Sequence, residues 1–159
     1  MSYFSESELD LRLSSPSSEL IEYFSTLNDD LLILGIGGKI GSSMGQMAVR
    51  AFAESGNKRR VIGVSRFSEA GVAENLNALG IETIPCDLLD RDAVSKLPRI
   101  KNVIFLAGRK FGSSDGGESL TWAMNTAVPA NVAEHFRDSK IVVFSGSMVK
   151  LMAWVAASN

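Results

Sequence analysis

The sequence predicts an α/β fold built on a doubly wound parallel sheet of about five strands. From about residue 30 onward, short apolar runs alternate with segments of helical period. The apolar runs are β-branched or leucine-rich on consecutive positions, which is typical of parallel strands buried on both faces. The links between runs and helical segments are short, so each crossover is expected to be right-handed, with helices on both faces of the sheet.

Five runs are candidate strands, and four segments between them are candidate helices. The strands are Leu31–Leu34, Val61–Val64, Ile81–Pro85, Val103–Ala107 and Ile141–Phe144. The helices are 39–55, 68–79, 90–97 and 118–138. We expect one extra helix within an N-terminal extension, 1–29, whose first dozen or so residues are expected to be disordered. The α/β domain is expected to span 30–147, and 148–159 forms an atypical apolar tail.

Composition excludes several classes of protein. At 159 residues the chain has the length of one domain, and its net charge of -2 does not favour nucleic acid or an anionic membrane. A single cysteine, Cys86, cannot form an internal disulfide and fits the reducing cytoplasm. The polar N-terminus has no signal-peptide core, and the apolar stretch MVKLMAWVAA is too short to span a bilayer. With His135 as the only histidine, we expect no metal site and take His135 as a surface residue.

The stretch LLILGIGGKIGSSMG, residues 31–45, follows the first strand and opens the first helix. Gly35 would let the chain turn sharply, Gly37 or Gly38 would let the backbone approach a pyrophosphate, and Gly41 would let the helix pack closely on the sheet. The positive end of the helix then faces the phosphates. The pattern predicts a dinucleotide site, and the alternative is a strand-to-helix turn without a ligand.

The second strand ends in Ser65 and Arg66, where an NAD site of this design usually has an acidic residue for the ribose hydroxyls. An arginine can pair with a 2′-phosphate through a bidentate fork. The sequence therefore favours NADP(H) over NAD(H). The alternative is that Arg66 is a solvated loop residue.

Two further strand ends carry candidate residues. Asp87 could accept a hydrogen bond from an adenine amino group, or it could be a turn residue, since Asp90 already fits the cap of the next helix. Ala107 and Gly108 are small enough to let a ribose lie against the backbone. The following polar, glycine-rich loop could close over a substrate or be a simple surface loop.

The long fourth helix contains Pro129, which has no N–H and leaves the carbonyl of Asn125 without its helical partner. This predicts a kink or a bound water at Asn125. Trp122, Thr126, Ala130 and Ala133 recur at helical spacing and are expected to form a packing face.

Six pieces of the sequence together resemble the extended short-chain dehydrogenase/reductase family, the nucleotide-sugar epimerase and dehydratase type. They are GIGGKIG, VIGVSR, PCDLLD, VIFLAG, WAMNTAVPANV and IVVFSGS. The resemblance covers roughly residues 30 to 147 and implies a Rossmann-type fold, with Asp87 at the adenine, Gly108 near the nicotinamide ribose and Asn125 as a structural asparagine. The expected cofactor-binding residues are Gly35, Gly37, Gly38, Lys39, Ile40, Gly41, Ser65, Arg66, Asp87, Leu88, Ala107, Gly108 and Asn125.

The resemblance also implies a catalytic serine or threonine at Ser147, with Ser145 as the nearby alternative. The family's Tyr-x-x-x-Lys pair, which transfers protons, has no match, because the only tyrosines are Tyr3 and Tyr23. The tail after Ser147 departs from the family pattern and is either a foreign or frameshifted segment or a family-specific ending. A chain cut here is expected to expose a sheet edge, and self-association through the tail is one way to cover it.

Three hypotheses follow. The chain is part of an NADP-linked oxidoreductase or epimerase, or it is a module that binds NADP(H) without turnover, or it is an interaction protein in which the glycine turn is structural only. The missing proton-transfer pair favours the second hypothesis for this polypeptide, which alone is expected to be inactive.

Overall fold

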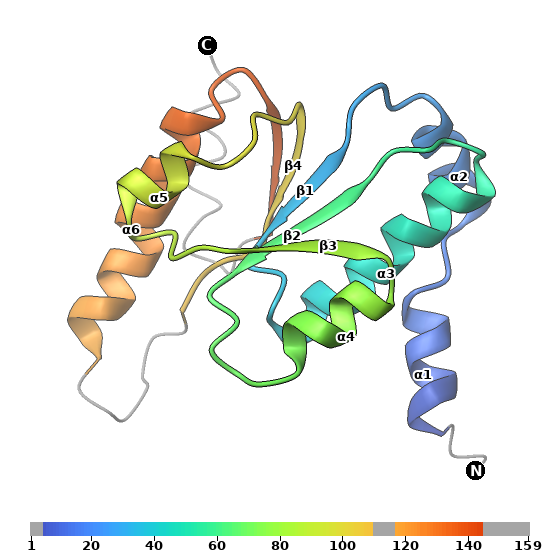
Figure 1. The fold of residues 1–159 in the computed structure, drawn as a ribbon, viewed down its shortest axis with the longest axis horizontal. Coiled ribbons are helices and arrows are strands. Elements are labelled where there is room, and N and C mark those ends of the chain that lie inside the picture. Colours follow the sequence, from blue (N-terminus) through green and yellow to red (C-terminus); the bar gives the residue numbers. More distant parts are fainter. Residues whose placement is uncertain (1–4, 110–116, 145–159) are drawn as a thin grey trace.

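The computed structural model describes residues 5–109 and 117–144, in which a five-stranded sheet lies between two layers of helices (Figure 1). The strands are β1 (Leu31–Leu34), β2 (Val61–Ser65), β3 (Ile81–Pro85), β4 (Asn102–Phe105) and β5 (Lys140–Val143). The helices are α1 (Glu6–Leu13), α2 (Ser18–Ser25), α3 (Lys39–Glu54), α4 (Val72–Ala78), α5 (Arg91–Ser95) and α6 (Glu118–His135).

The sheet has the order β3-β2-β1-β4-β5, and every neighbouring pair is parallel. The predicted doubly wound fold is therefore confirmed. In the central strand, Leu34 aligns with Val64 on one side and with Phe105 on the other, so the carboxyl ends of the strands meet at one edge. The order reverses between β1 and β4, which is where open α/β sheets bind ligands.

Both faces of the sheet are buried, which explains why the strands are apolar on consecutive positions. In β1, Leu32 and Leu34 face a core formed with α5 and α6, whereas Leu31 and Ile33 face a core formed with α2, α3 and α4. These four side chains are at most 4% exposed. Burying a side chain of this size contributes roughly 1.5–3 kcal/mol, so the central strand is the main apolar anchor of the domain.

The chain before β1 contains two helices, not the single helix expected. The first dozen residues were expected to be disordered, but residues 6–13 form helix α1. Helix α1 begins at a capping box: Glu8 N–H donates to Ser5 Oγ, and the Glu8 carboxylate accepts from Ser5 N–H at 2.8 Å. Helix α1 then contacts α3, where Arg50 donates to the Leu11 carbonyl at 3.3 Å. The predicted helix is α2, which is capped by Ser17.

Helix α6 buries a different face from the one predicted. Val128, Val132 and Phe136 at its end are at most 2% exposed, whereas Trp122 is 55% exposed. The other members of the predicted face, Thr126, Ala130 and Ala133, are also exposed. Apolar residues occupy several sides of this helix, so its sequence pattern allows two faces, and contact with the sheet decides between them.

His135 is buried rather than at the surface. Its side chain is 8% exposed, and its ring lies edge-on to Phe136 with the centroids 4.6 Å apart. Nε2 lies 3.0 Å from the Leu97 carbonyl oxygen, so this polar ring is satisfied inside the protein. The residue joins the end of α6 to the segment after α5.

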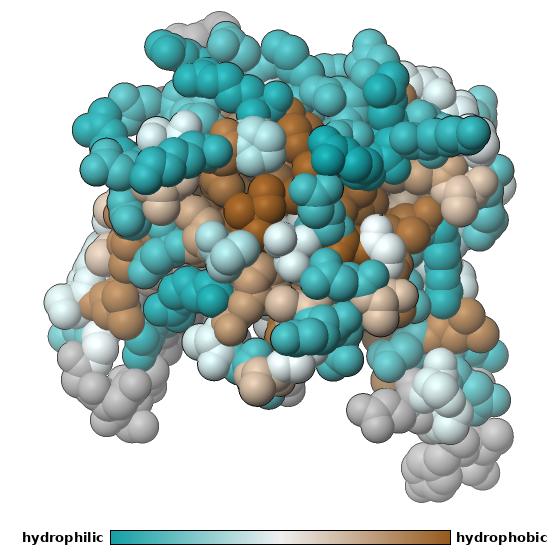
Figure 2. All heavy atoms as spheres, in the orientation of Figure 1, coloured by the Kyte–Doolittle hydropathy of each residue, from teal (hydrophilic) through white to brown (hydrophobic). Residues whose placement is uncertain are grey.

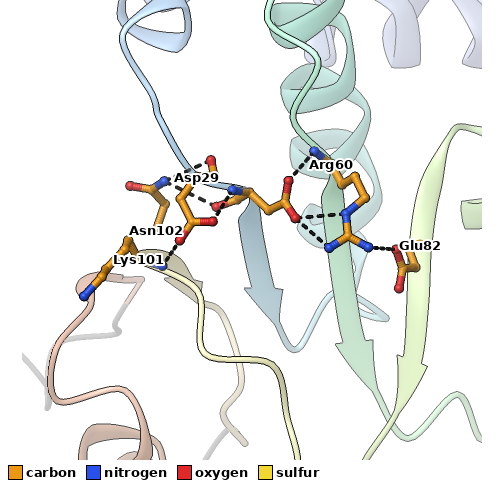
Figure 3. A network of polar contacts seen from close by, with 6 residues as sticks. Asp29, Arg60, Glu82, Lys101 and Asn102 are labelled. Atoms are coloured by element: carbon orange, nitrogen blue, oxygen red, sulfur yellow. Dashed lines mark hydrogen bonds and ion pairs between the residues drawn. The ribbon is translucent and has the colours of Figure 1, made fainter.

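A polar network fixes the amino ends of three strands (Figure 3). Asp30 accepts from the backbone N–H of Arg60 at 2.8 Å, and its Oδ2 lies 2.7 Å from the Arg60 guanidinium. Asp29 accepts from the backbone N–H of Lys101 at 2.8 Å, and Asn102 donates to the carbonyls of both aspartates. The two aspartates before β1 thus hold β2 on one side and β4 on the other.

Strand β5 forms one edge of the sheet. Val142, Val143 and Phe144 are 57%, 42% and 51% exposed, so this end of the sheet has little cover from the described residues. Within residues 5–109 and 117–144, no helix is long and apolar enough to cross a membrane.

Candidate functional site

The carboxyl edge of the sheet brings together most of the residues that the sequence singled out. The glycine turn follows β1, Arg66 follows β2, Asp87 follows β3, and Ala107 follows β4. Since neighbouring strands are in register up to Leu34, these segments leave the sheet at about the same level. Together they surround the point at which the strand order reverses.

The turn after β1 is held by its backbone. Gly35 has a φ of +87°, and its N–H donates to the Val64 carbonyl at 2.8 Å, as does the N–H of Ile36 at 3.2 Å. A Cβ on Gly35 would lie 2.6 Å from the backbone nitrogen of Ala107. Only glycine fits here, because the left-handed backbone and the close approach of the β4 end both exclude a side chain.

The other tight glycines contact protein atoms as well. A Cβ on Gly37 would lie 2.7 Å from Ser65 Oγ, and one on Gly41 would overlap the carbonyl of Ile36. Gly41 thus lets the start of α3 lie close to the backbone that leaves β1, and Gly45 is a second close contact, because its Cβ would lie 2.7 Å from Ile81 Cδ1. Gly41 and Gly45 are four residues apart in α3, so they lie on the same face of the helix.

Gly38 is different, because no contact with the described residues requires a glycine there. Its φ of -82° is ordinary for any residue, and the atom nearest to an added Cβ is the Gly35 carbonyl oxygen at 3.8 Å. It is the N-cap of α3, a position where asparagine, aspartate and serine are preferred over threonine and glycine, and no side chain caps this helix. The N-terminus of α3 is thus open, and the neighbouring Ile40 is 64% exposed.

The N-terminus of α3 has the features of an anion-binding site, because the helix is long and has no side-chain cap. The first N–H groups of a helix have no carbonyl partner within it, and the aligned peptide dipoles add a partial positive charge. Helix α3 has 16 residues and begins at Lys39, immediately after the turn. Of the turn and helix start, Gly37, Gly38 and Ile40 are exposed to solvent, so a ligand has access to the backbone.

The end of β2 presents one cation at this edge. Arg66 is exposed and makes no hydrogen bond or ion pair with the described residues. The next residue, Phe67, has a φ of +47°, a strained value for an aromatic residue, and its ring packs on the core under α3 and α4. Arg59 and Arg60 lie at the opposite end of β2, away from this edge.

Asp87 forms the turn that the sequence analysis gave as one of its two roles. Its Oδ1 accepts from the N–H of Leu89 at 3.0 Å, while Asp90 caps α5 as expected. The side chain of Leu88 is 5% exposed and belongs to the core, so this residue can offer only its backbone to a ligand. Burial, followed by the charges of the two aspartates, raises the pKa of the Cys86 thiol.

Asn125 fixes the segment after β4. Its Oδ1 accepts from the backbone N–H of Arg109 at 3.1 Å, and its Nδ2 donates to the carbonyl of the same residue at 2.8 Å. A Cβ on Gly108 would lie 3.5 Å from the same Oδ1, an ordinary contact. The amide thereby holds the chain as a neighbouring strand would, while α6 continues through Pro129.

Several expected features lie outside the described residues. These are Ser145 and Ser147, the apolar tail, and most of the glycine-rich loop, 110–116. Tyr23 is on α2, which packs on α3, and it is 55% exposed. No cluster of three or more potential metal ligands occurs in the part of the chain that the structure describes.

Comparisons with known proteins place the fold. No protein-family model matches the sequence, and no curated protein matches it. Among solved structures, the chain is similar to ADP-L-glycero-D-manno-heptose-6-epimerase from Helicobacter pylori, with a TM-score of 0.61 and 22% identity over 84% of this chain and 42% of that one.

Two further similarities concern structures with bound dinucleotides. One is Pseudomonas aeruginosa RhlG in its NADP active-site complex, with a TM-score of 0.56 and 21% identity over 73% of this chain and 49% of that one. The other is the Bordetella bronchiseptica enzyme WbmG in complex with NAD, with a TM-score of 0.58 and 16% identity over 77% of this chain and 39% of that one. The chain thus spans less than half of each of these three proteins, and the expected Rossmann-type fold, shorter than the whole enzymes, is confirmed.

Proposed function

We propose that this chain binds a nicotinamide dinucleotide at the carboxyl edge of its sheet, with the pyrophosphate at the N-terminus of α3. The observation that supports this most is Gly38, a glycine that neither its backbone angle nor its neighbours require. A glycine at this N-cap places no side chain over the first turn, in which the N–H of Gly41 donates to the Gly38 carbonyl at 3.0 Å and the N–H groups of Lys39 and Ile40 remain to face an anion. The structurally similar RhlG and WbmG are solved with NADP and NAD.

The preferred cofactor is NADP(H). Arg66 is placed after β2, where an acidic residue would accept hydrogen bonds from the ribose hydroxyls of NAD, and it is exposed with no partner among the described residues. A guanidinium in this place gains two charge-assisted hydrogen bonds from a 2′-phosphate. Asp87, with one carboxylate oxygen engaged in its turn, keeps the other for the adenine amino group.

The same polypeptide is proposed to bind the cofactor without turnover. A reductase or epimerase of the resembling family needs a tyrosine beside the nicotinamide, and the sequence has only Tyr3 and Tyr23. The second of these lies on α2 rather than at the carboxyl edge. We expect the purified chain to show no change in NADPH absorbance with sugar nucleotides, and cofactor-dependent turnover would contradict this part of the proposal.

A second candidate function is an interaction module in which the turn has no ligand. It is favoured by Gly35, Gly37 and Gly41, because contacts within the protein explain all three without a dinucleotide. The two functions differ in whether NADPH stabilises the folded chain.

The test is a thermal-shift titration of the wild type, Arg66→Ala and the matched control Arg137→Ala with NADPH and, separately, NADH. A ligand at about 100 times its Kd adds about 2.7 kcal/mol to stability. For a chain of 159 residues this corresponds to roughly 5–11 °C in Tm. We expect Arg66→Ala to reduce the NADPH shift strongly, to change the NADH shift little, and Arg137→Ala to change neither.

The remaining outcomes separate the parts of the proposal. Equal losses for both cofactors in Arg66→Ala would overturn the 2′-phosphate assignment but not the site. The absence of any shift with either cofactor would favour the interaction module.

A further inference from the structure

We infer that a second binding site lies at the amino edge of the sheet and takes small amphipathic anions, each an apolar body with one carboxylate or phosphate group. The site is independent of the proposed function. It lies at the start of β2, whereas Arg66 follows the end of this five-residue strand. At about 3.3 Å per residue, the two ends of the strand are roughly 13 Å apart.

The site is a cavity of about 540 Å³ between the last turns of α3 and the first residues of β2 and β3. This volume is within the range of about 300–1,000 Å³ that small-molecule sites occupy. Its floor is apolar: Phe52 and Val61 are 3% and 2% exposed, and Val49 and Ala53 complete the lining on the helix side. Figure 2 shows this view of the molecule, in which apolar side chains (brown) are visible near the middle and polar ones (teal) around them.

Two glycines leave this cavity open. Gly56 and Gly80 both line it, and both have left-handed backbones, with φ of +71° and +84°. Gly56 is exposed, and a Cβ there would meet no described atom within 4 Å. A ligand can therefore enter over the two turns and reach the apolar floor.

The polar side of the cavity carries an excess of positive charge. Lys58, Arg59 and Arg60 line it in succession, together with Glu82. The charge of Arg60 is balanced by Asp30 at 2.7 Å and by Glu82 at 2.9 Å (Figure 3). Lys58 and Arg59 make no ion pair or hydrogen bond with the described residues. Within the described residues, two cations of this cavity, Lys58 and Arg59, thus have no ion-pair partner, while the carboxylate of Glu82 pairs with Arg60.

Two carbonyls at the carboxyl end of α3 already accept hydrogen bonds within the protein. The N–H of Gly56 donates to the Ala53 carbonyl at 3.2 Å, and the N–H of Asn57 donates to the Phe52 carbonyl at 3.0 Å. This Schellman-type ending satisfies two of the open carbonyls. The Asn57 side chain donates to the carbonyls of Phe24 and Leu27 at 2.8 and 2.7 Å, so the segment that leads to the two cations is fixed before a ligand arrives.

These features select one class of ligand. The buried aromatic and aliphatic floor favours a hydrocarbon body, since burial of apolar surface is the main favourable term in such sites. Lys58 and Arg59 favour a single anionic group at one end of that body, and they do not discriminate by shape between a carboxylate and a phosphate. A free inorganic anion would meet the cations but would not use the floor.

The experiment is a titration of the full, isotope-labelled chain followed by amide proton–nitrogen correlation spectra. The probes are phenylbutyrate and phenyl phosphate, and the controls without an apolar body are acetate and inorganic phosphate. Glycine amides give separated signals, so Gly56 and Gly80 report on this cavity while Gly35 and Gly41 report on the carboxyl edge. We expect saturable shifts at Gly56 and Gly80 with one or both probes, and much smaller shifts with acetate and inorganic phosphate.

Variants test the two parts of the site separately. We expect Lys58→Gln with Arg59→Gln to weaken probe binding by about fivefold, because two exposed charges are removed. The matched pair Lys96→Gln with Arg137→Gln, exposed cations elsewhere, should leave it unchanged. Ala53→Phe, which fills the cavity and keeps its charge, should also abolish the shifts at Gly56 and Gly80.

Three results would overturn the inference. They are shifts confined to Gly35 and Gly41, equal shifts at Gly56 and Gly80 for acetate and phenylbutyrate, and binding that is unaffected by both Lys58→Gln/Arg59→Gln and Ala53→Phe. Phenylbutyrate alone or phenyl phosphate alone would identify which anionic group the site prefers.

Discussion

Gly38→Asp is expected to stabilise the free protein and to weaken dinucleotide binding by about 30-fold. The N-cap of α3 has φ -82° and ψ 168°, which suits aspartate, and an added Cβ would have no atom closer than 3.8 Å. The new carboxylate accepts hydrogen bonds from the first turn and interacts favourably with the helix dipole. These gains amount to about 0.5–1 kcal/mol. For a chain of 159 residues they raise Tm by roughly 1–4 °C.

The same carboxylate would occupy the place proposed for the pyrophosphate. Two unit charges about 4 Å apart repel by ~4 kcal/mol at an effective dielectric constant of 20. A repulsion of only half this size, ~2 kcal/mol, already raises the Kd for the dinucleotide by about 30-fold. The opposite signs of the two effects distinguish a ligand site from a structural turn, which would show the gain in stability alone.

The assay combines Tm of the free protein with NADPH titration by thermal shift, for the wild type, Gly38→Asp and Ser17→Asp. Ser17 caps α2, so its replacement adds the same charge at the N-terminus of another helix. We expect Ser17→Asp to leave the NADPH shift unchanged. Wild-type NADPH binding by Gly38→Asp would refute the pyrophosphate assignment, and a lower Tm would refute the open, uncapped start of α3.

Three further perturbations test the fold around the site. Asn125→Ala leaves the backbone of Arg109 without two hydrogen bonds of 3.1 and 2.8 Å, so we expect a loss of about 1–3 kcal/mol in urea unfolding; Thr126→Ala is the control, and equal losses in both would contradict the role of the amide. Asp30→Ala is expected to lower Tm by roughly 2–6 °C in calorimetry, because it removes the bonds to Arg60, whereas Glu134→Ala removes only the exposed pair with Arg91 and should change Tm by about 1 °C or less. Cys86, whose pKa is raised by burial, should react with iodoacetamide much more slowly in the native than in the unfolded chain. Because the pKa of this thiol is higher in the folded than in the unfolded chain, its contribution to the free energy of unfolding is complete below the unfolded pKa and is lost as the pH rises above about 9. Cys86→Ala should therefore reduce the loss of stability at alkaline pH. Fast alkylation of the native chain would refute the assigned burial.

The strands were predictable because burial determines both their composition and their place. Leu31–Leu34 has the predicted bounds, since four consecutive apolar residues fit only a strand covered on both faces. Strand β4 ends at Phe105 rather than Ala107, because its last pairing is with Leu34, and the apolar residues beyond it belong to the loop. Hydrophobicity therefore located this strand, but hydrogen bonding set its end.

The errors arose where local pattern and tertiary contact differ. Helix α1 has exposed leucines and little apolar periodicity toward the core, and its signal was the capping pair of Ser5 and Glu8. The buried face of α6 and the burial of His135 depend on which side of the helix meets the sheet. The sequence could not predict which side of α6 packs on the sheet, because the helix has apolar residues on more than one side.

In the candidate site too, features set by local sequence were predictable and features set by tertiary contacts were not. Its backbone parts, the glycine turn and the open start of α3, were predicted from glycine spacing after a strand. The contact between Asn125 and Arg109 was not, because it joins residues 16 positions apart and leaves no periodic trace. The distinction between Gly38 and the other glycines also required the structure, since only the neighbours of each missing Cβ separate a packing need from an open position.

The aspartate pair before β1 has a consequence for how this domain tolerates change. Asp29 and Asp30 fasten the central strand to β2 and β4 at its amino end, through backbone N–H groups that any residue other than proline at 60 or 101 would provide. The register of the sheet is thereby set on the side away from the glycine turn. The loops at the carboxyl side do not have to set this register, so their sequences can change while the strands stay aligned.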